Sequence, residues 1–208
     1  MLVNEIFCSI DGEVNHYGLG TMSTFVRFAG CNLTCDYCDV RDMSDGKEMT
    51  VDEIVATVQE FPARKVTITG GEPLIQDHDE LEKLLTCFHF IGKKVTIETN
   101  GTIEIPGTML VLACWVIDFK IGQNFALDSI EISNLFPGDY IKFVIANKED
   151  YEFARNKYYE LRKRTVANFA FSPVCGELYP AKLFSWMLED GLCDVKLNVQ
   201  LNKYINLR

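Results

Sequence analysis

The chain has no long hydrophobic run and no excess of positive charge. None of its apolar stretches reaches the roughly 20 residues that a membrane-spanning helix needs, so we expect no association with a membrane. The first residues carry acidic side chains and no basic cluster, which predicts that there is no export signal. Lys and Arg number 20 against 30 Asp and Glu, and a net charge of −10 would repel a phosphate backbone. We therefore expect no nucleic-acid partner.

The sequence also lacks linkers rich in Pro, Gly or Ser, and it has no repeat with a recognisable signature. Its 208 residues are enough for one well-buried core, so we expect residues 1–208 to form a single domain. Eight cysteines without an export signal favour a reducing cytoplasm, with a metal or redox site rather than disulfides.

Short apolar runs alternate with helical patterns along the chain. Thr50 followed by Glu53 is a capping box and predicts the start of a helix. The longest apolar run, residues 107–118, is interpreted as part of a buried strand. We expect strands at residues 23–30, 65–71, 93–101, 110–120, 140–146, 167–173 and 194–200.

This strand–helix order predicts an α/β fold with parallel strands and crossover helices. A complete eight-unit barrel typically needs about 250 residues. Because the chain is shorter, we expect a partial (β/α) barrel of about six parallel strands, open on one side.

Distinctive polar residues stand where four of the predicted strands end. They form the segments TGGE at 69–72, ETNG at 98–101, DFK at 118–120 and SP at 172–173. Ligands of parallel α/β folds collect at the carboxyl ends of the strands. The four segments are therefore expected to belong to one site.

Three cysteines, Cys31, Cys35 and Cys38, lie within eight residues, and no fourth follows closely. A structural zinc site and a ferredoxin cluster each use four protein ligands. With three thiolates, one iron of a [4Fe–4S] cluster keeps an open position that the amino and carboxylate groups of S-adenosylmethionine can occupy. An electron from the cluster can then cleave the sulfonium C–S bond, and the resulting 5′-deoxyadenosyl radical requires an enclosed pocket.

The alternative interpretation is a zinc site in a non-enzymatic zinc-binding adaptor. The three cysteines would then be completed by Asp36, Asp39 or His16. A zinc knuckle normally supplies its second ligand pair at a recognisable spacing, and the sequence has none. The cluster is therefore the preferred interpretation.

The cysteine loop, with an aromatic residue before its third cysteine, resembles the signature of the radical S-adenosylmethionine superfamily. Within that superfamily the chain resembles the 7-carboxy-7-deazaguanine synthases over nearly its whole length. The segments that carry the resemblance are EIFCSIDGE, STFVRFAGCNLTCDYCDV, TITGGEPLIQ, TIETNGT, DYIKFVIANKEDYEFA and FAFSPVCGELYP.

The resemblance implies a set of site residues. The [4Fe–4S] cluster would be held by Cys31, Cys35 and Cys38. S-adenosylmethionine would lie against Tyr37, Asp39, Gly70, Gly71, Glu72, Glu98, Asp118, Phe119, Lys120 and Ser172. The substrate would contact Ile10, Asp11, Gly12, Glu13, Arg27, Thr69 and Thr99. Glu13 would accept hydrogen bonds from the pterin edge, and Arg27 would bind the substrate carboxylate in a bidentate manner. No catalytic side chain is expected beyond the cluster and the cofactor.

The implied activity is that of a carbon–nitrogen lyase in deazapurine biosynthesis of the queuosine type. The substrate would be 6-carboxy-5,6,7,8-tetrahydropterin. The adenosyl radical would remove a hydrogen atom from its C6, and the substrate radical would rearrange, take the hydrogen back and lose ammonia. The product would be 7-carboxy-7-deazaguanine, and S-adenosylmethionine would be regenerated.

Three positions depart from the family pattern. The family commonly has a threonine that helps hold Mg²⁺ where this chain has Val40, and valine offers no oxygen ligand. We therefore expect a weaker dependence on magnesium. The family usually has glutamine in place of Asp11 and histidine in place of Asn202.

A glycyl-radical-enzyme activase is the alternative within the same superfamily, since it shares the cysteine loop and an Asp-x-Lys turn. Such an enzyme would need a surface for a protein substrate, whereas Glu13 and Arg27 suit a pterin. The family and the short loop at residues 41–49 predict a homodimer. An electron donor such as flavodoxin would reduce the cluster.

Overall fold

The computed structural model describes residues 1–35, 38, 45–121 and 132–207. In chain order its elements are β1 (Leu2–Ile10), β2 (Met22–Phe28), β3 (Lys47–Glu48), α1 (Val51–Gln59), β4 (Lys65–Gly70), η1 (Pro73–Ile75), α2 (His78–Phe90), β5 (Lys94–Thr99), α3 (Gly107–Leu110), β6 (Cys114–Lys120), η2 (Ile132–Asn134), β7 (Tyr140–Ile145), α4 (Lys148–Leu161), β8 (Asn168–Pro173), α5 (Pro180–Glu189), β9 (Val195–Leu197) and α6 (Leu201–Tyr204).

The strands of the described residues join one nine-stranded sheet in the order β3-β1-β2-β4-β5-β6-β7-β8-β9. The seven strands from β2 to β9 are parallel to one another, while β1 runs antiparallel to β2 and β3 antiparallel to β1. Within the described part of the chain, the end strands β3 and β9 do not pair, so the sheet stays open. The predicted α/β fold, an open partial barrel of parallel strands, is confirmed.

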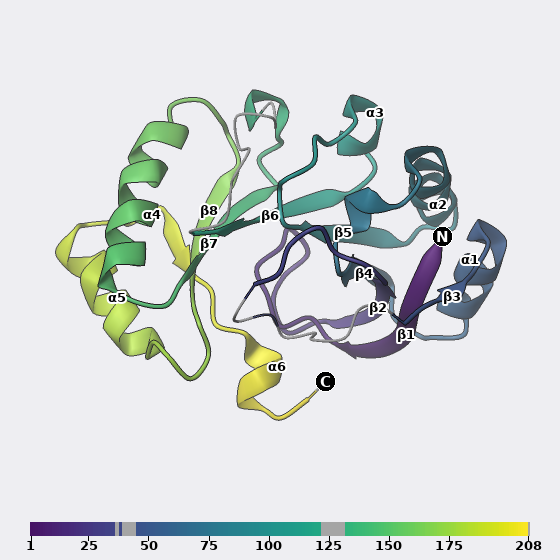
Figure 1. Ribbon diagram of the computed structural model, residues 1–208, viewed down its shortest axis with the longest axis horizontal. Coiled ribbons are helices and arrows are strands. Elements are labelled where there is room, and N and C mark those ends of the chain that lie inside the picture. Colours follow the sequence, from purple (N-terminus) through teal and green to yellow (C-terminus); the bar gives the residue numbers. More distant parts are fainter. Residues whose placement is uncertain (36–37, 39–44, 122–131, 208) are drawn as a thin grey trace.

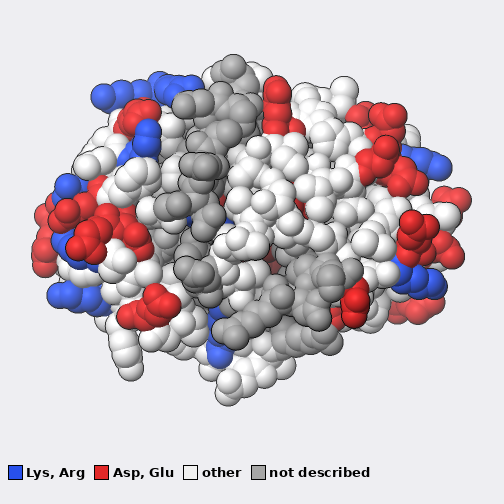
Figure 2. All heavy atoms as spheres, in the orientation of Figure 1, with Lys and Arg blue, Asp and Glu red and all other residues white. Residues whose placement is uncertain are grey.

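Figure 1 shows the sheet as an arc with its helices on the outside. Helices α4 and α5 cover one end of the arc, and α1 and α2 cover the other, while the chain after β1 and helix α6 lie on the inner side. Charged side chains on this face gather toward the two ends of the molecule, over these two helix pairs (Figure 2).

Helix boundaries follow from local hydrogen bonds. The predicted capping box is present at α1, where the Thr50 hydroxyl accepts from the Glu53 N–H at 3.3 Å and the Glu53 carboxylate accepts from the Thr50 N–H at 2.8 Å. At α2 and α4 the N-cap side chains of Asp77 and Asn147 accept from the N–H groups of Glu80 and Asp150. None of the helices in the described residues is long and apolar enough to cross a membrane.

The hydrophobic core lies between the helices and the outer face of the sheet. Outward-facing strand residues such as Val26, Ile68 and Ile97 are fully buried there against helix residues such as Ile54 and Leu84. Strand side chains alternate between the two faces of a sheet. The inner face of the arc therefore receives the polar members of the same strands, and it is this face that forms the site.

The prediction of a strand over residues 107–118 is wrong in its first half. Pro106 is the N-cap of the short helix α3, and Met109 and Leu110 are buried in the core from that helix. Strand β6 begins at Cys114, whose register partner on β5 is Thr96. A buried four-residue helix and a buried strand both produce an apolar run, so the run alone cannot separate them.

The sequence analysis also placed no strand over residues 2–10, where β1 lies. Eight of its nine residues are only partly buried, and Asn4 and Glu5 interrupt its apolar pattern. Pairing with β2 over almost its full length holds β1 in place, so a tertiary contact outweighs a weak local signal.

Candidate functional site

A cavity of about 790 Å³ opens at the carboxyl ends of the parallel strands. Its volume lies in the range of pockets for small molecules and cofactors. Residues predicted for the site line most of it, namely Ile10, Asp11, Gly12, Glu13, Arg27, Cys31, Cys35, Cys38, Thr69, Gly70, Gly71, Glu98, Thr99, Asp118, Lys120 and Ser172. The structure thus brings together segments that are more than 150 residues apart. Tyr37, Asp39 and Val40 lie outside the described residues.

The three cysteines of the motif face this cavity. Cys31 and Cys38 are exposed and Cys35 is half-buried. Burial raises the pKa of the Cys35 thiol, Lys120 lowers it, and the neighbouring Cys38 and Cys31 raise it again. In the described residues, no three His, Cys, Asp or Glu side chains are already grouped around one metal position. The donor chemistry nevertheless fits an iron–sulfur cluster, because thiolates are its usual ligands and all three belong to one loop at one cavity wall.

Gly70, the last residue of β4, lies against Phe28 of β2, and the next residue, Gly71, lies directly against the cysteine loop at Gly30 and Cys31. Gly70 has a φ of 123°, and a Cβ at Gly71 would overlap the carbonyl oxygen of Gly30. That carbonyl accepts a hydrogen bond of 2.9 Å from the Glu72 N–H. Glycine is therefore required here for the approach of one turn to another, as well as for the approach of any ligand in the cavity.

Glu72 is fully buried, and it is not among the residues that line the cavity. Its carboxylate accepts hydrogen bonds from the Leu74 N–H at 2.9 Å, the Thr99 hydroxyl at 2.7 Å and the Asn100 N–H at 2.6 Å. The side chain therefore joins the turn after β4 to the turn after β5. Its position does not support the assignment of Glu72 to the cofactor.

Phe119 also points away from the cavity. It is buried and packs against Phe143 with ring centroids 4.8 Å apart, whereas Asp118 and Lys120 face the cavity. Because alternate residues of a strand face opposite sides, the side chain of Phe119 belongs to the core. Only its backbone remains near the predicted cofactor site.

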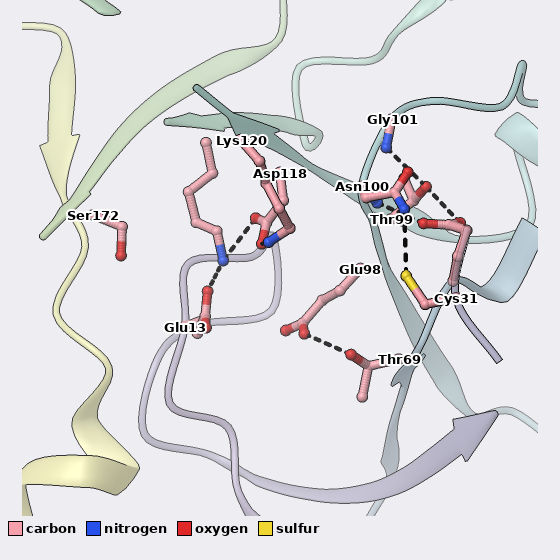
Figure 3. Close-up of polar contacts among 12 residues, drawn as sticks. Glu13, Cys31, Thr69, Glu98, Thr99, Asn100, Gly101, Asp118, Lys120 and Ser172 are labelled. Carbon is pink, nitrogen blue, oxygen red and sulfur yellow. Dashed lines mark hydrogen bonds and ion pairs between the residues drawn. The ribbon is translucent and has the colours of Figure 1, made fainter. Parts of the chain in front are cut away.

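Glu98 stands on the inner face of β5, where it accepts a hydrogen bond of 3.0 Å from the Thr69 hydroxyl (Figure 3). Burial raises the pKa of its carboxyl group to about 8, and the negative charges of Asp11 and Asp118 add to the effect. At neutral pH this carboxyl group is mostly protonated. It can then donate a hydrogen bond to a ligand in the cavity.

A network of charged side chains forms another wall of the cavity, away from the three cysteines. Lys142 on β7 is 2% exposed, and its ammonium group forms ion pairs with the Glu13 carboxylate and, at 2.8 Å, with the Asp118 carboxylate. Glu13 also accepts hydrogen bonds from Gln200 at 2.7 Å and Asn198 at 3.4 Å. These contacts hold Glu13 at the cavity wall in one orientation.

Lys142 was not among the predicted site residues. It is the one charged residue within the otherwise apolar strand YIKFVI. A charge in a strand that is buried on both faces needs a partner of opposite charge, and this is the signal that identifies it.

A second buried ion pair joins the cavity-lining residue Asp11 to the amino end of β4. Asp11 is 1% exposed and pairs with Lys65, and its carboxylate also accepts from the Thr67 hydroxyl at 3.1 Å. Burial raises the pKa of Asp11, and the charge of Lys65 opposes this shift. Lys65, the first residue of β4, does not itself line the cavity but is the buried partner of a residue that does.

Arg27, predicted to bind the substrate carboxylate, lines the cavity. It forms an ion pair of 2.6 Å with Glu5 through one guanidinium nitrogen and lies over the Phe7 ring, 4.9 Å from its centroid. Gly12 packs against Asn202, which occupies the space that a Cβ at position 12 would need. The C-terminal segment thus forms part of the cavity wall.

Comparisons with known proteins agree with this arrangement. A model of the radical SAM superfamily matches residues 25–112. A 7-carboxy-7-deazaguanine synthase of Clostridium acetobutylicum is 36% identical, over 98% of this chain and 95% of that protein. A protein of the same name from Koribacter versatilis is 36% identical, over 99% of this chain and 96% of that protein.

A crystal structure of QueE from Escherichia coli shares the fold. It has a TM-score of 0.72 and 21% identity, and the match covers 96% of this chain and 93% of that chain. The matches to these sequence relatives extend over nearly the whole chain. The chain therefore belongs to the radical SAM superfamily and, within it, to the family of 7-carboxy-7-deazaguanine synthases.

Proposed function

We propose that this protein converts 6-carboxy-5,6,7,8-tetrahydropterin into 7-carboxy-7-deazaguanine and ammonia, as a step of deazapurine biosynthesis. The observation that carries the proposal is the composition of the cavity. Three thiols lie on one wall, and a fixed carboxylate and an arginine lie on the others. A small molecule with hydrogen-bond donors at one end and a carboxylate at the other matches this distribution.

Cys31, Cys35 and Cys38 would hold a [4Fe–4S] cluster. When bound, the cluster and S-adenosylmethionine would supply the electron and the carbon-centred radical that begin the reaction. The chain's own contribution is to bind, to orient and to exclude water from the cavity. The cofactor would lie along Gly70, Gly71, Glu98, Asp118, Lys120 and Ser172, together with the segment around Tyr37 and Asp39.

Glu98 and Lys120 would bind different parts of the cofactor. The protonated Glu98 carboxyl group would donate a hydrogen bond, while the Lys120 ammonium, 3.2 Å from the Asp118 carboxylate, would present positive charge. An alternation of donors and charges along one wall orients a ligand that carries both hydroxyl and carboxylate groups. Ser172, whose hydroxyl accepts from Asn198 at 3.1 Å, would complete this wall.

Glu13 would accept hydrogen bonds from the donors of the pterin edge, since three neighbouring side chains already fix its carboxylate. Arg27 would bind the substrate carboxylate. A guanidinium has five N–H donors, so an ion pair with Glu5 through one nitrogen still allows a bidentate contact with a ligand. Ile10, Asp11, Gly12, Thr69 and Thr99 would surround the ring.

We further propose that magnesium, where it binds, is held by water, backbone and substrate without a side-chain ligand from Val40. The presence of valine at this position of the sequence supports the proposal, because its side chain has no oxygen. We also propose a homodimer in the cytoplasm, reduced by a donor such as flavodoxin. Family membership and the eight free thiols support these assignments.

The test is anaerobic turnover. Protein reconstituted with iron and sulfide should contain about four irons per chain. With a reductant, S-adenosylmethionine and the carboxypterin, it should yield the deazapurine, which is followed by its ultraviolet absorption and mass. Cys35→Ala should bind less iron and form no product. Wild-type protein with a full cluster that forms no deazapurine would refute the proposal.

A further inference from the structure

The side chain of Asn100, in the turn after β5, lies between the cysteine loop and the core. It is 5% exposed, and its amide nitrogen Nδ2 is 3.8 Å from the Cys31 sulfur (Figure 3). None of the roles assigned above uses this residue.

The hydrogen bonds of Asn100 fix which end of its amide faces the sulfur. The oxygen Oδ1 accepts from the Thr102 N–H at 3.0 Å and from the Thr102 hydroxyl at 2.6 Å. A backbone N–H can only donate, so the atom next to it must be the oxygen. The NH₂ group therefore points to the cysteine loop.

The NH₂ group has two hydrogens, and the structure gives each an acceptor. One lies toward the Asn32 Oδ1 at 2.9 Å, and the other toward Cys31. The Asn32 amide donates in turn to the Thr102 hydroxyl at 2.7 Å, which closes a ring of three side chains. Each of the three side chains donates to another within this ring, and the second hydrogen of the Asn100 NH₂ group is directed at the Cys31 sulfur.

The backbone holds the ring in place. The Asn100 N–H donates to the buried carboxylate of Glu72 at 2.6 Å, so the turn cannot move away from the cysteine loop without leaving that carboxylate short of a donor. The Cys31 sulfur also accepts a hydrogen bond of 3.4 Å from the backbone N–H of Leu33. Side-chain substitutions leave that backbone donor in place.

We propose that Asn100 is a positioning residue that donates a hydrogen bond to the Cys31 sulfur and raises the reduction potential of the cluster bound there. Reduction adds negative charge to the cluster sulfurs, so a donor at one of them stabilises the reduced form more than the oxidised form. The inference rests on the proposed function, because it requires a cluster on Cys31.

The test compares reduction potentials of anaerobically reconstituted proteins, by redox titration monitored with electron paramagnetic resonance. Asn100→Ala removes the donor and should shift the potential to a more negative value. Asn100→Asp keeps an acceptor for Thr102 but places a negative charge at the sulfur, so its shift should be larger. Asn32→Ala opens the ring at an exposed residue and leaves the donor to Cys31, so its potential should equal that of the wild type.

Equal potentials in the wild type, Asn100→Ala and Asn100→Asp, at equal iron content, would overturn the inference. If the Asn100 variants bind less iron, their potentials cannot be compared, and a measurement on the wild-type protein tests the hydrogen bond instead. Asparagine labelled with ¹⁵N in its side-chain amide should give a ¹⁵N coupling to the reduced cluster, and the coupling should persist in Asn32→Ala. Absence of that coupling would overturn the inference, whereas wild-type protein without iron would overturn the proposed function.

Discussion

Replacing Glu98 by glutamine should change how the stability of the protein depends on pH. In the folded chain the carboxyl group of Glu98 has a pKa of about 8, against a usual value of 4.5. The folded state therefore binds a proton between these two pH values that the unfolded state has released. The free energy of unfolding therefore falls as the pH rises through that window, and the contribution of Glu98 to it becomes constant above pH 8.

One unit of pKa shift corresponds to about 1.4 kcal/mol. Between pH 6 and pH 9 only the part of the window up to pH 8 is crossed, so the wild type should lose about 3 kcal/mol relative to Glu98→Gln. This is an upper value. The carboxyl group is partly open to a cavity that water can enter, and water would stabilise the ionised form.

Urea unfolding of both proteins at pH 6 and pH 9, followed by circular dichroism under anaerobic conditions, measures this difference. Thr69→Val is the matched variant, because the Thr69 hydroxyl lowers the pKa of Glu98, so its removal should extend the window to higher pH and increase the loss of stability between pH 6 and pH 9. An infrared band of a protonated carboxyl group should disappear near pH 8 in the wild type and be absent in Glu98→Gln. Parallel stability curves for wild type and Glu98→Gln would refute a raised pKa.

Three further predictions concern other parts of the site. Lys142→Met leaves the carboxylates of Glu13 and Asp118 without their ammonium partner, so it should cost about 3–5 kcal/mol of stability. It should also raise the KM for the carboxypterin at least about tenfold, with normal iron content. An unchanged KM would exclude a role of Lys142 in orienting Glu13. Gly71→Ala should cost about 1–3 kcal/mol and lower the iron content, because its methyl group meets backbone, whereas Gly107→Ala, where nothing lies within 4 Å, should change neither. Val40→Thr should increase the stimulation of turnover by magnesium, and the same response as in the wild type would show that the residue is irrelevant to the metal.

Much of the fold could be predicted because local signals coincide with it. Thr50 and Glu53 mark a helix start through contacts three residues apart, and the polar residues after each strand mark its end. Such signals fail where tertiary contacts decide, as in β1, which depends on pairing with β2, and in α3, whose buried residues continue the apolar run of β6.

In the candidate site, the residues that belong to contiguous motifs were predicted, and those that act as partners were not. Glu13 and Lys142 are 129 residues apart in the chain, and no local pattern connects them. The positions of Glu72 and Phe119 depend on which way one side chain turns within a motif. That direction follows from packing around the motif and not from its spacing.

The partners of Glu13 also set an order in which the site can be built. Asn198 and Gln200 lie near the end of the chain, and the Leu201 N–H donates to the Gly12 carbonyl at 3.0 Å. During synthesis the cysteine loop and the first strands emerge before residues 198–201, which make these contacts. A nascent chain that has already exposed its thiols therefore still lacks part of the surface proposed to bind the pterin, so changes confined to residues 198–201 should affect substrate binding without affecting cluster assembly.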